Sequence, residues 1–474
     1  MINILDYLKK QNKYKNILEN LKDNQNIYIG NIASNASKYL TSLIFEQTKQ
    51  NIIYVCENIY EASKAFEVLA DILGTDNVSF FPVEEFVSLD LVASSSAFRL
   101  ARMMTIANIV KKIPQVIVTN TEGIVKNVIS KTLLEKSIIN INKGDIYNIS
   151  KLEKDLIIRG YKRCAVAETV GTFSKRGSII DIYPINETTS IRINFFDDEI
   201  ESIKLIDLEV QLSKERLNKI EIYPMYDIYY EEENIPLIKE RLLKLVKEKD
   251  SSFDKIVNNI ENYNDIEQLS LYLPIIDDNY VTFIDLFDKP ICIFDEFKKI
   301  KEHEIKTKTE TLSYLKQNKK DFLFEYILNV DDVKLRNNIN IYVNALMPTL
   351  HEEFFHQLYD FKTSNTVEYH NNLKAVFDNI ELMNQTGETI YLQASVDSLF
   401  DYLKSAKKGR PLLAQKNDEE LYIFIKENLK KREPYYLQAR HVLDSMDESD
   451  LLFDELLNSH PSNSLKRSKP TAVP

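Results

Sequence analysis

Tryptophan is absent from this 474-residue chain, and glycine occurs only nine times and histidine only six times. No apolar run approaches the ~20 residues that a membrane-spanning helix needs, and the opening residues Met1 to Asp6 do not resemble a signal peptide. The three cysteines, Cys56, Cys164 and Cys292, lie far apart inside apolar segments. This usage predicts buried, reduced thiols in a cytoplasmic protein and disfavours a disulfide framework or a metal site.

The charge balance is acidic, with 60 Lys and Arg against 72 Asp and Glu and a net charge of -12. Such a balance argues against a surface that coats nucleic acid along the whole chain. The chain is too long for a single hydrophobic core, so we expect about two to four domains.

The first part of the chain, residues 1–130, alternates short apolar runs with helical segments. After a helical pattern over 1–25, the runs of strand length are 27–29, 52–55, 78–81 and 116–119. Helical patterns near 36–49, 60–73, 95–112 and 121–129 separate or follow them. Continuously apolar strands that alternate with helices predict a parallel sheet covered on both faces.

Residues 131–213 change to an antiparallel pattern, with alternating runs at 178–183 and 191–196 and an acidic hairpin tip within 195–203. We interpret them as an inserted β-rich domain. The α/β pattern resumes over 214–318, where 220–224, 281–284 and 291–295 read as strands and 235–249 and 253–263 as helices.

A third, small α/β domain is predicted over 319–455. Its expected strands are 339–343 and 388–392, and its expected helices are 371–384 and 395–406. The Ser-, Pro- and Lys-rich tail over 456–474 is predicted to be disordered.

The turn after the first apolar run lies where a phosphate-binding loop would sit. A working loop ends in Gly-Lys-Ser/Thr, but here Asn35-Ala36-Ser37 takes that place and Gly30 is the single glycine. Lys38 is the candidate substitute for the missing lysine, but we expect its side chain to point along its own helix. We therefore interpret Gly30, Ser37 and Lys38 as a degenerate, non-functional phosphate loop.

Other candidate chemistry is weak. Asp295-Glu296 resembles the metal-holding acidic pair of an ATPase, but it reads more simply as the acidic start of a helix. His351 and His356 are five positions apart and diverge on a helix, whereas a zinc-protease motif needs a spacing of four. We therefore predict a solvated helix face there, no metal site, and no catalytic residues in this chain.

The segment from Gly160 to Gly177 holds three of the nine glycines and four basic side chains. A cationic surface that meets an acidic partner explains this cluster in an acidic chain. Arg163 and Arg176 are suited to bidentate bonds with partner carboxylates. Phe173, which reads as exposed, would be the apolar anchor between them.

Lys162, Lys175 and Arg159 would lie at the rim of that surface and steer association. Two other interpretations stay open. Arg176 and Phe173 could hold the hairpin together against Asp181 or Asp198, or the basic cluster could bind DNA directly.

Several blocks together resemble the N-terminal part of the bacterial transcription-repair coupling factor family, whose relative is the excinuclease protein UvrB. The blocks are Phe80-Phe81-Pro82 with Glu84-Glu85, Ser94-Ser95 and Arg99; 160–184; 192–203; and 271–296. The resemblance covers about residues 25–300, and the third domain is assigned by position alone. The resemblance implies a degenerate helicase-like parallel-sheet domain that is interrupted by a UvrB-type interaction domain. It also implies that the interaction domain docks on the excinuclease protein UvrA and recruits it to a stalled RNA polymerase.

The degenerate phosphate loop and the short 83–93 segment distinguish this chain from UvrB, which keeps the loop and inserts a DNA-clamping hairpin. In the coupling-factor family, a polymerase-binding domain and an ATP- and Mg-dependent DNA translocase follow. This chain ends before them. We expect a fragment, a truncated reading frame or a stand-alone adaptor, with ATP, DNA and polymerase contacts left to the missing domains.

Overall fold

The computed structural model describes residues 5, 9, 12–22, 26–85, 95–207, 213–246, 251–334, 336, 338–347, 356–363, 380, 384, 389–405 and 417–444. The chain divides into two compact units. The larger unit is Ile4–Asn365, and the smaller one combines Met1–Asn3 with Thr366–Pro474. The predicted disordered tail, 456–474, lies outside the described residues.

A seven-stranded sheet with the strand order β17-β1-β16-β15-β2-β4-β3 forms the centre of the larger unit. Each described pair of neighbouring strands in it is parallel. The strands are β1 (Ile27–Gly30), β2 (Ile52–Cys56), β3 (Val78–Phe81), β4 (Val116–Asn120), β15 (Ile291–Asp295), β16 (Ile339–Val343) and β17 (Gln357–Asp360).

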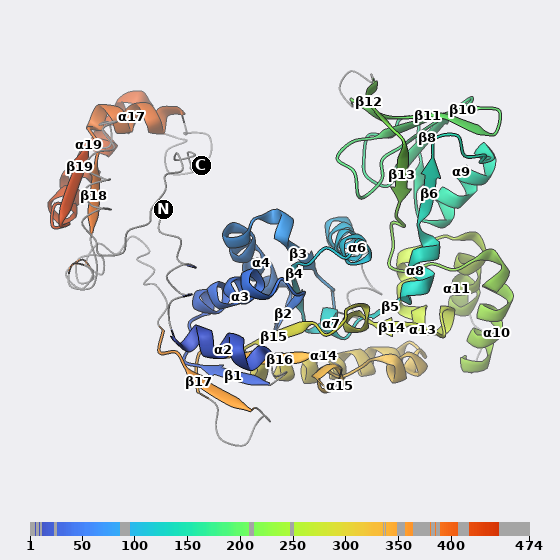
Figure 1. Ribbon diagram of the computed structural model, residues 1–474, viewed down its shortest axis with the longest axis horizontal. Helices are drawn as coiled ribbons and strands as arrows, with labels where there is room; N and C mark the ends of the chain where they lie inside the picture. The colour runs from blue at the N-terminus through green and yellow to red at the C-terminus, as the bar shows by residue number, and fades with distance from the viewer. Residues whose placement is uncertain are drawn as a thin grey trace. The chain divides into compact units, whose positions relative to one another are not determined.

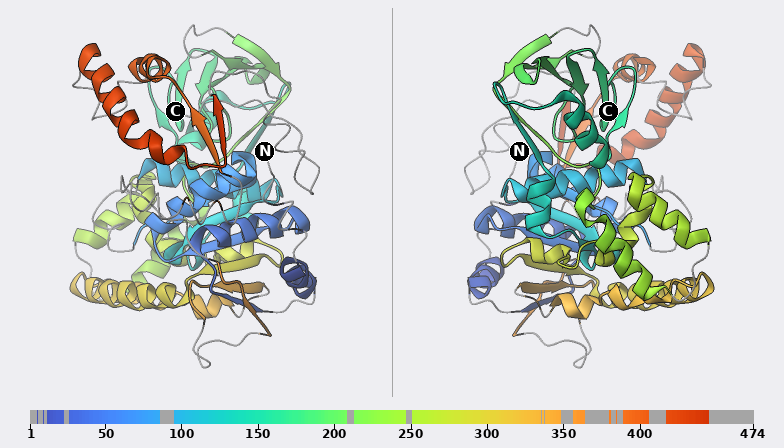
Figure 2. Two further views of the ribbon diagram at one scale, coloured as in Figure 1. Left: turned by 90° about the vertical axis from the view of Figure 1, so that its left-hand side faces the viewer. Right: turned by 90° about the vertical axis from the view of Figure 1, so that its right-hand side faces the viewer.

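Helices cover both faces of this sheet, as Figure 1 and Figure 2 show. Alternate strand residues such as Ile52 and Tyr54 pack with helices α2 (Asn12–Lys22), α3 (Ser34–Thr48) and α4 (Ile59–Leu73). The intervening residues, such as Ile53 and Val55, pack with α14 (Phe297–Gln317) on the opposite face. The predicted parallel sheet with two covered faces is confirmed.

The second sheet of the larger unit has six strands in the order β12-β11-β10-β9-β8-β7. They are β7 (Lys162–Arg163), β8 (Thr172–Arg176), β9 (Ile179–Ile182), β10 (Ile191–Phe196), β11 (Glu199–Ile206) and β12 (Ser213–Leu217). Helix α9 (Ile149–Ile158) packs beside this sheet (Figure 1). The predicted β-rich region is therefore present.

Short elements join the two sheets. The pair β6 (Ile139–Asn142) and β13 (Lys219–Ile222) is antiparallel, as is the pair β5 (Asn127–Val128) and β14 (Val281–Thr282). The other described α-helices of the larger unit are α6 (Ser96–Val110), α7 (Thr121–Ile124), α8 (Lys131–Ser137), α10 (Ile235–Leu245), α11 (Ser251–Asn262), α12 (Ile266–Leu269), α13 (Leu273–Ile276) and α15 (Val330–Lys334). The 3₁₀ turns η3 (Ser270–Tyr272) and η5 (Asp321–Tyr326) flank α13 and α14.

Three predicted strands belong elsewhere than expected. Residues 220–224 and 281–284 do not extend the parallel sheet, because β13 pairs with β6 and β14 with β5. Strand β16 lies inside the parallel sheet between β1 and β15, so the predicted domain boundary at residue 319 was wrong. The compact unit continues to Asn365. The other neighbour of β16 is β1, near the start of the chain, so the position of β16 along the chain did not reveal that pairing.

The described part of the smaller unit contains a parallel strand pair, β18 (Ile390–Gln393) with β19 (His441–Asp444), and the helices α17 (Val396–Ser405) and α19 (Asp418–Tyr436). Its described core centres on Leu421 and Ile425 of α19. The predicted helix over 371–384 lies largely outside the described residues. Among the described helices, none is both long and apolar enough to span a membrane.

Candidate protein-binding surface

Phe173, the predicted anchor of a partner surface, is fully buried. It pairs with Ile182 across β8 and β9 and packs in the core with Ile180 and Ile191. The prediction that Phe173 is exposed was wrong. Successive side chains of a strand point to opposite faces, and the mixed composition of Thr172–Arg176 did not show which face lies inward.

The basic residues predicted to form the partner surface lie in different environments. Arg163 and Lys175 both form ion pairs with Glu153 of α9, at 2.6 Å and 2.9 Å. Arg159 is buried, and its Nε donates to the Ser137 carbonyl oxygen at 2.5 Å, so its predicted place at an exposed rim was wrong. Lys162 lies exposed on β7. These residues do not form one continuous patch.

Arg176 lies on the opposite face of the sheet, beside a buried carboxylate. Its Nη2 donates to Asp181 Oδ2 at 2.5 Å, while Arg192 holds both oxygens of Asp181 at 2.7 Å and 2.8 Å. The Asp181 side chain is 3% exposed, whereas that of Arg176 is 52% exposed. Hydrogen bonding to Asp181 raises the pKa of Arg192. The alternative in which Arg176 pairs with Asp181 is therefore confirmed, yet half of its side chain still faces solvent.

Two exposed apolar side chains lie on the same face at the β10–β11 hairpin. Phe196 is 70% exposed and Ile146 is 75% exposed. Phe196 lies opposite Glu199 in the β10–β11 register, and Glu199 also bridges to Ile146. Directly opposed residues share a sheet face, so Phe196 and Ile146 flank Glu199 on one surface. We call Arg176, Asp181, Arg192, Phe196 and Ile146 the open face.

Arg192 and Phe196 were not predicted as site residues, although the sequence contained a signal for them. The run Ile191–Phe196 alternates, and its residues Ile191, Ile193 and Phe195 are buried. A sheet with one covered face cannot bury two consecutive phenylalanines. Because Phe195 lies in the core, Phe196 must face solvent.

The turn predicted to be a degenerate phosphate loop makes contacts with other residues of the chain. Lys38 Nζ lies 2.8 Å from Asp295 Oδ2, and Tyr54 donates to the same oxygen at 2.7 Å. Ser37 and Tyr54 join their hydroxyls at 2.8 Å. Burial and the nearby Asp295 raise the pKa of Tyr54 well above its ordinary value, so its hydroxyl stays protonated.

These contacts correct two expectations. Lys38 does not simply extend along α3, because its ammonium group reaches across to the carboxyl end of β15. Asp295 is its ion-pair partner and does not serve merely as the acidic start of α14. Thr363 Oγ1 accepts from Ala33 N at 2.6 Å, so the chain after β17 contacts the turn at Thr363. The non-functional interpretation of the loop remains a prediction.

The remaining candidates offer little further chemistry. Cys56 and Cys292 are buried free thiols, whereas Cys164 is only partly buried. Of the predicted helix face 351–356, only His356 is described, and its Nδ1 accepts from Asn26 N at 3.0 Å. Within the described part of the chain, acidic, cysteine and histidine side chains form no group suited to a metal ion.

Comparison with known proteins identifies two segments. Residues 139–227 match the family model of the UvrB interaction domain, and residues 375–460 match that of shikimate kinase. Transcription-repair-coupling factor from Staphylococcus aureus (strain bovine RF122 / ET3-1) is 25% identical over 345 residues. That alignment includes 69% of this chain and 30% of the relative. The protein of the same name from Bacillus subtilis (strain 168) is 25% identical over 330 residues, 66% of this chain and 28% of the relative.

The chain therefore resembles the N-terminal region of transcription-repair-coupling factors and spans about 30% of the length of the curated relatives it matches. A solved shikimate kinase from Bacteroides thetaiotaomicron is 25% identical and matches 35% of this chain and 84% of its own. Its TM-score is 0.17. The assignment of the third domain to the coupling-factor family remains a prediction based on position.

Proposed function

We propose that this chain acts in transcription-coupled nucleotide excision repair by recruiting UvrA through the open face of its β-rich domain. The match of residues 139–227 to the UvrB interaction domain supports a repair-protein partner. The similarity of most of the chain to transcription-repair-coupling factors supports the coupling role. Free buried thiols fit our proposal that this role is carried out in the cytoplasm.

The observation that supports the open face most directly is the exposure of Phe196 on the sheet face that also carries Arg176 and Arg192. An aromatic side chain that is 70% exposed gains most when a partner buries it. Asp181 holds Arg176 and Arg192 in fixed positions, so little side-chain freedom is lost when they bind a partner. Arg176 and Arg192 share the Asp181 carboxylate, and the half-exposed Arg176 keeps N–H donors for an acidic group on UvrA.

The alternative is that the chain belongs to an ATP-dependent DNA translocase whose motor lies in another part of the protein. In that case RNA polymerase and DNA would be reached through the other domains, and the open face would still recruit UvrA. A stand-alone repair adaptor would use the same face. Recruitment of UvrA through the open face is common to all three possible functions, so a measurement of UvrA binding tests it.

Calorimetric titration of the full chain with purified UvrA tests the proposal. We expect Phe196→Ala and Arg176→Ala each to raise the Kd at least about tenfold, the loss expected of an interface anchor or a bond to a charged group. Tyr60→Ala is the matched control, because Tyr60 is a similarly exposed aromatic side chain, 66% exposed, on α4. Equal affinity of the unaltered chain and Phe196→Ala would exclude the open face as the binding site.

A further inference from the structure

A row of basic side chains crosses the sheet of the β-rich domain from β10 to the edge strand β12 (Figure 1). Arg192 of β10 lies directly opposite Lys204 of β11, and Lys204 lies directly opposite Arg216 of β12. Directly opposed residues share a sheet face and have Cβ atoms about 5 Å apart. Asp181 of the open face lies opposite Arg192 on β9, so the row continues the open face. We call Arg192, Lys204 and Arg216 the cation row.

The alternation of side chains along these strands shows that the cation row faces solvent. Ile193 and Ile203, which alternate with its members, are buried and point to the core. Arg216 is exposed and Lys204 is partly exposed. Glu215 directly precedes Arg216 on β12, so its side chain points to the opposite face and does not offset the charge of the row.

The positive charge of Lys204 and Arg216 is not offset within the described part of the chain. The Asp181 carboxylate binds Arg192, with bonds of 2.7 Å and 2.8 Å. By contrast, neither Lys204 nor Arg216 forms an ion pair or a side-chain hydrogen bond with a described residue. The cation row therefore presents two positive charges that an external anion can neutralise.

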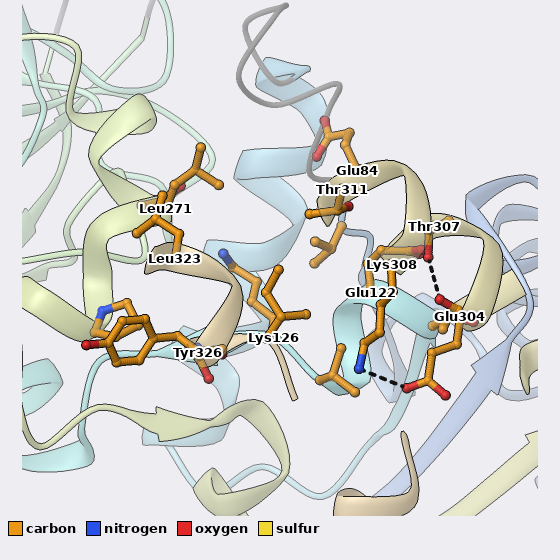
Figure 3. Close-up of a pocket in the computed structure, with 17 residues that line it drawn as sticks. Glu84, Glu122, Lys126, Leu271, Glu304, Thr307, Lys308, Thr311, Leu323 and Tyr326 are labelled. Atoms are coloured by element: carbon orange, nitrogen blue, oxygen red, sulfur yellow. Dashed lines mark hydrogen bonds and ion pairs between the residues drawn. The ribbon is translucent and has the colours of Figure 1, made fainter. Parts of the chain in front are cut away.

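Partly buried lysines elsewhere in the larger unit do have carboxylate partners. Lys308 lies 3.4 Å from Glu304, as Figure 3 shows, and Lys126 lies 3.2 Å from Asp227. Lys204 differs from them, because basic residues oppose it on both neighbouring strands. Like charges directly opposite each other destabilise a sheet. Lysine on an edge strand hinders aggregation, but Lys204 lies inside the sheet, so an anionic ligand explains its place better.

The rest of the open face favours protein carboxylates over the phosphates of a nucleic acid. Further along β10, Glu199 lies beside the exposed apolar side chains of Phe196 and Ile146. A nucleic acid carries a negative charge at every nucleotide, so it would bring phosphates close to Glu199 as well as to the cation row. A protein segment can place carboxylates on the row and apolar side chains on Phe196. The net charge of -12 also disfavours a polyanion.

We propose that the cation row binds an acidic segment of UvrA, whose carboxylates pair with Lys204 and Arg216 while its apolar side chains cover Phe196. This proposal rests on the proposed recruitment of UvrA, and it adds the chemical class of the segment that the open face receives. Charge-assisted bonds orient such a segment and raise its association rate, so binding should weaken as the ionic strength rises.

Calorimetric titration of UvrA into the full chain and into its Lys204→Gln/Arg216→Gln variant tests the proposal. We expect the double variant to raise the Kd at least about tenfold and to make the Kd less dependent on salt. Neither side chain bonds to a described residue, so the melting temperature should not fall. The matched control, Lys299→Gln/Lys306→Gln, removes the same charge from exposed positions of α14 and should leave the Kd unchanged.

Two probes test the chemical class of the ligand without UvrA. Octaglutamate and single-stranded octathymidylate carry similar charge, but they present carboxylates and phosphates, respectively. In NMR titrations of the full chain, we expect octaglutamate to bind more tightly than octathymidylate. The Lys204→Gln/Arg216→Gln variant should bind octaglutamate at least about tenfold more weakly than the unaltered chain does.

Three results would overturn the proposal, and they differ in what else they exclude. Equal affinity of UvrA for the unaltered chain and the double variant would remove the cation row from the interface and leave the recruitment of UvrA intact. No binding of UvrA to the unaltered chain would contradict the proposed function as well. Tighter binding of octathymidylate than of octaglutamate, lost in the double variant, would assign the cation row to nucleic acid.

Discussion

Phe173 and Phe196 show that residue type alone does not determine whether a phenylalanine in a strand is buried or exposed. Both lie in strands of the same sheet and both are followed by charged residues within two positions. Phe173 is fully buried, whereas Phe196 is 70% exposed. The sequence identified the segment that contains Phe173, but it did not show which face of the sheet each phenylalanine occupies. The face depends on strand register and on the helix that covers one side of the sheet.

The two phenylalanines should therefore respond differently to truncation. We expect Phe173→Ala to lower the free energy of unfolding by about 3–5 kcal/mol, because it leaves a cavity in the core. Phe196→Ala should change it by less than about 0.5 kcal/mol, as for a surface position. Denaturant unfolding measures both. A Phe173→Ala variant as stable as the unaltered chain would contradict the burial of this ring.

At the scale of elements, the sequence predicted most of the parallel sheet. The runs at 27–29, 52–55, 78–81 and 116–119 became β1 to β4, because continuous apolar runs are typical of strands buried on both faces. The pairing of β16 with β1 was not predictable, since β1 lies near the start of the chain. The contact of Lys38 with Asp295 was missed for the same reason.

The Lys38–Asp295 pair joins α3 to the carboxyl end of β15, so it should contribute to stability. The side chains are 6% and 18% exposed. Lys38→Met leaves the Asp295 carboxylate without its cation, and we expect the free energy of unfolding to fall by at least about 2 kcal/mol. Chemical denaturation of this variant and of Asp295→Asn, which keeps a group for Tyr54 to bind, provides the measurement.

The double variant Lys38→Met/Asp295→Asn should recover part of the loss, because it leaves no unpaired charge. If Lys38→Met unfolds at the same denaturant concentration as the unaltered chain, the pair has no structural role. The turn would then again be a candidate for binding a ligand.

At the scale of the whole molecule, the larger unit brings together the residues that the proposals concern. It contains the parallel sheet and the β-rich domain with its open face and cation row. The segment that matches shikimate kinase lies within the smaller unit, whereas the segment that matches the UvrB interaction domain lies within the larger unit. The UvrA proposal is therefore confined to the larger unit. The net charge of -12 describes the whole chain and does not show where Arg176 and Arg192 lie on the open face.

Hydrogen–deuterium exchange of the full chain, with and without saturating UvrA, tests the central claim most directly. We predict slower exchange on UvrA binding in peptides spanning β8 to β11, residues 172–206, and unchanged exchange in α9, residues 149–158. Unchanged exchange over 172–206 in the presence of bound UvrA, or protection restricted to α9, would contradict docking through the open face.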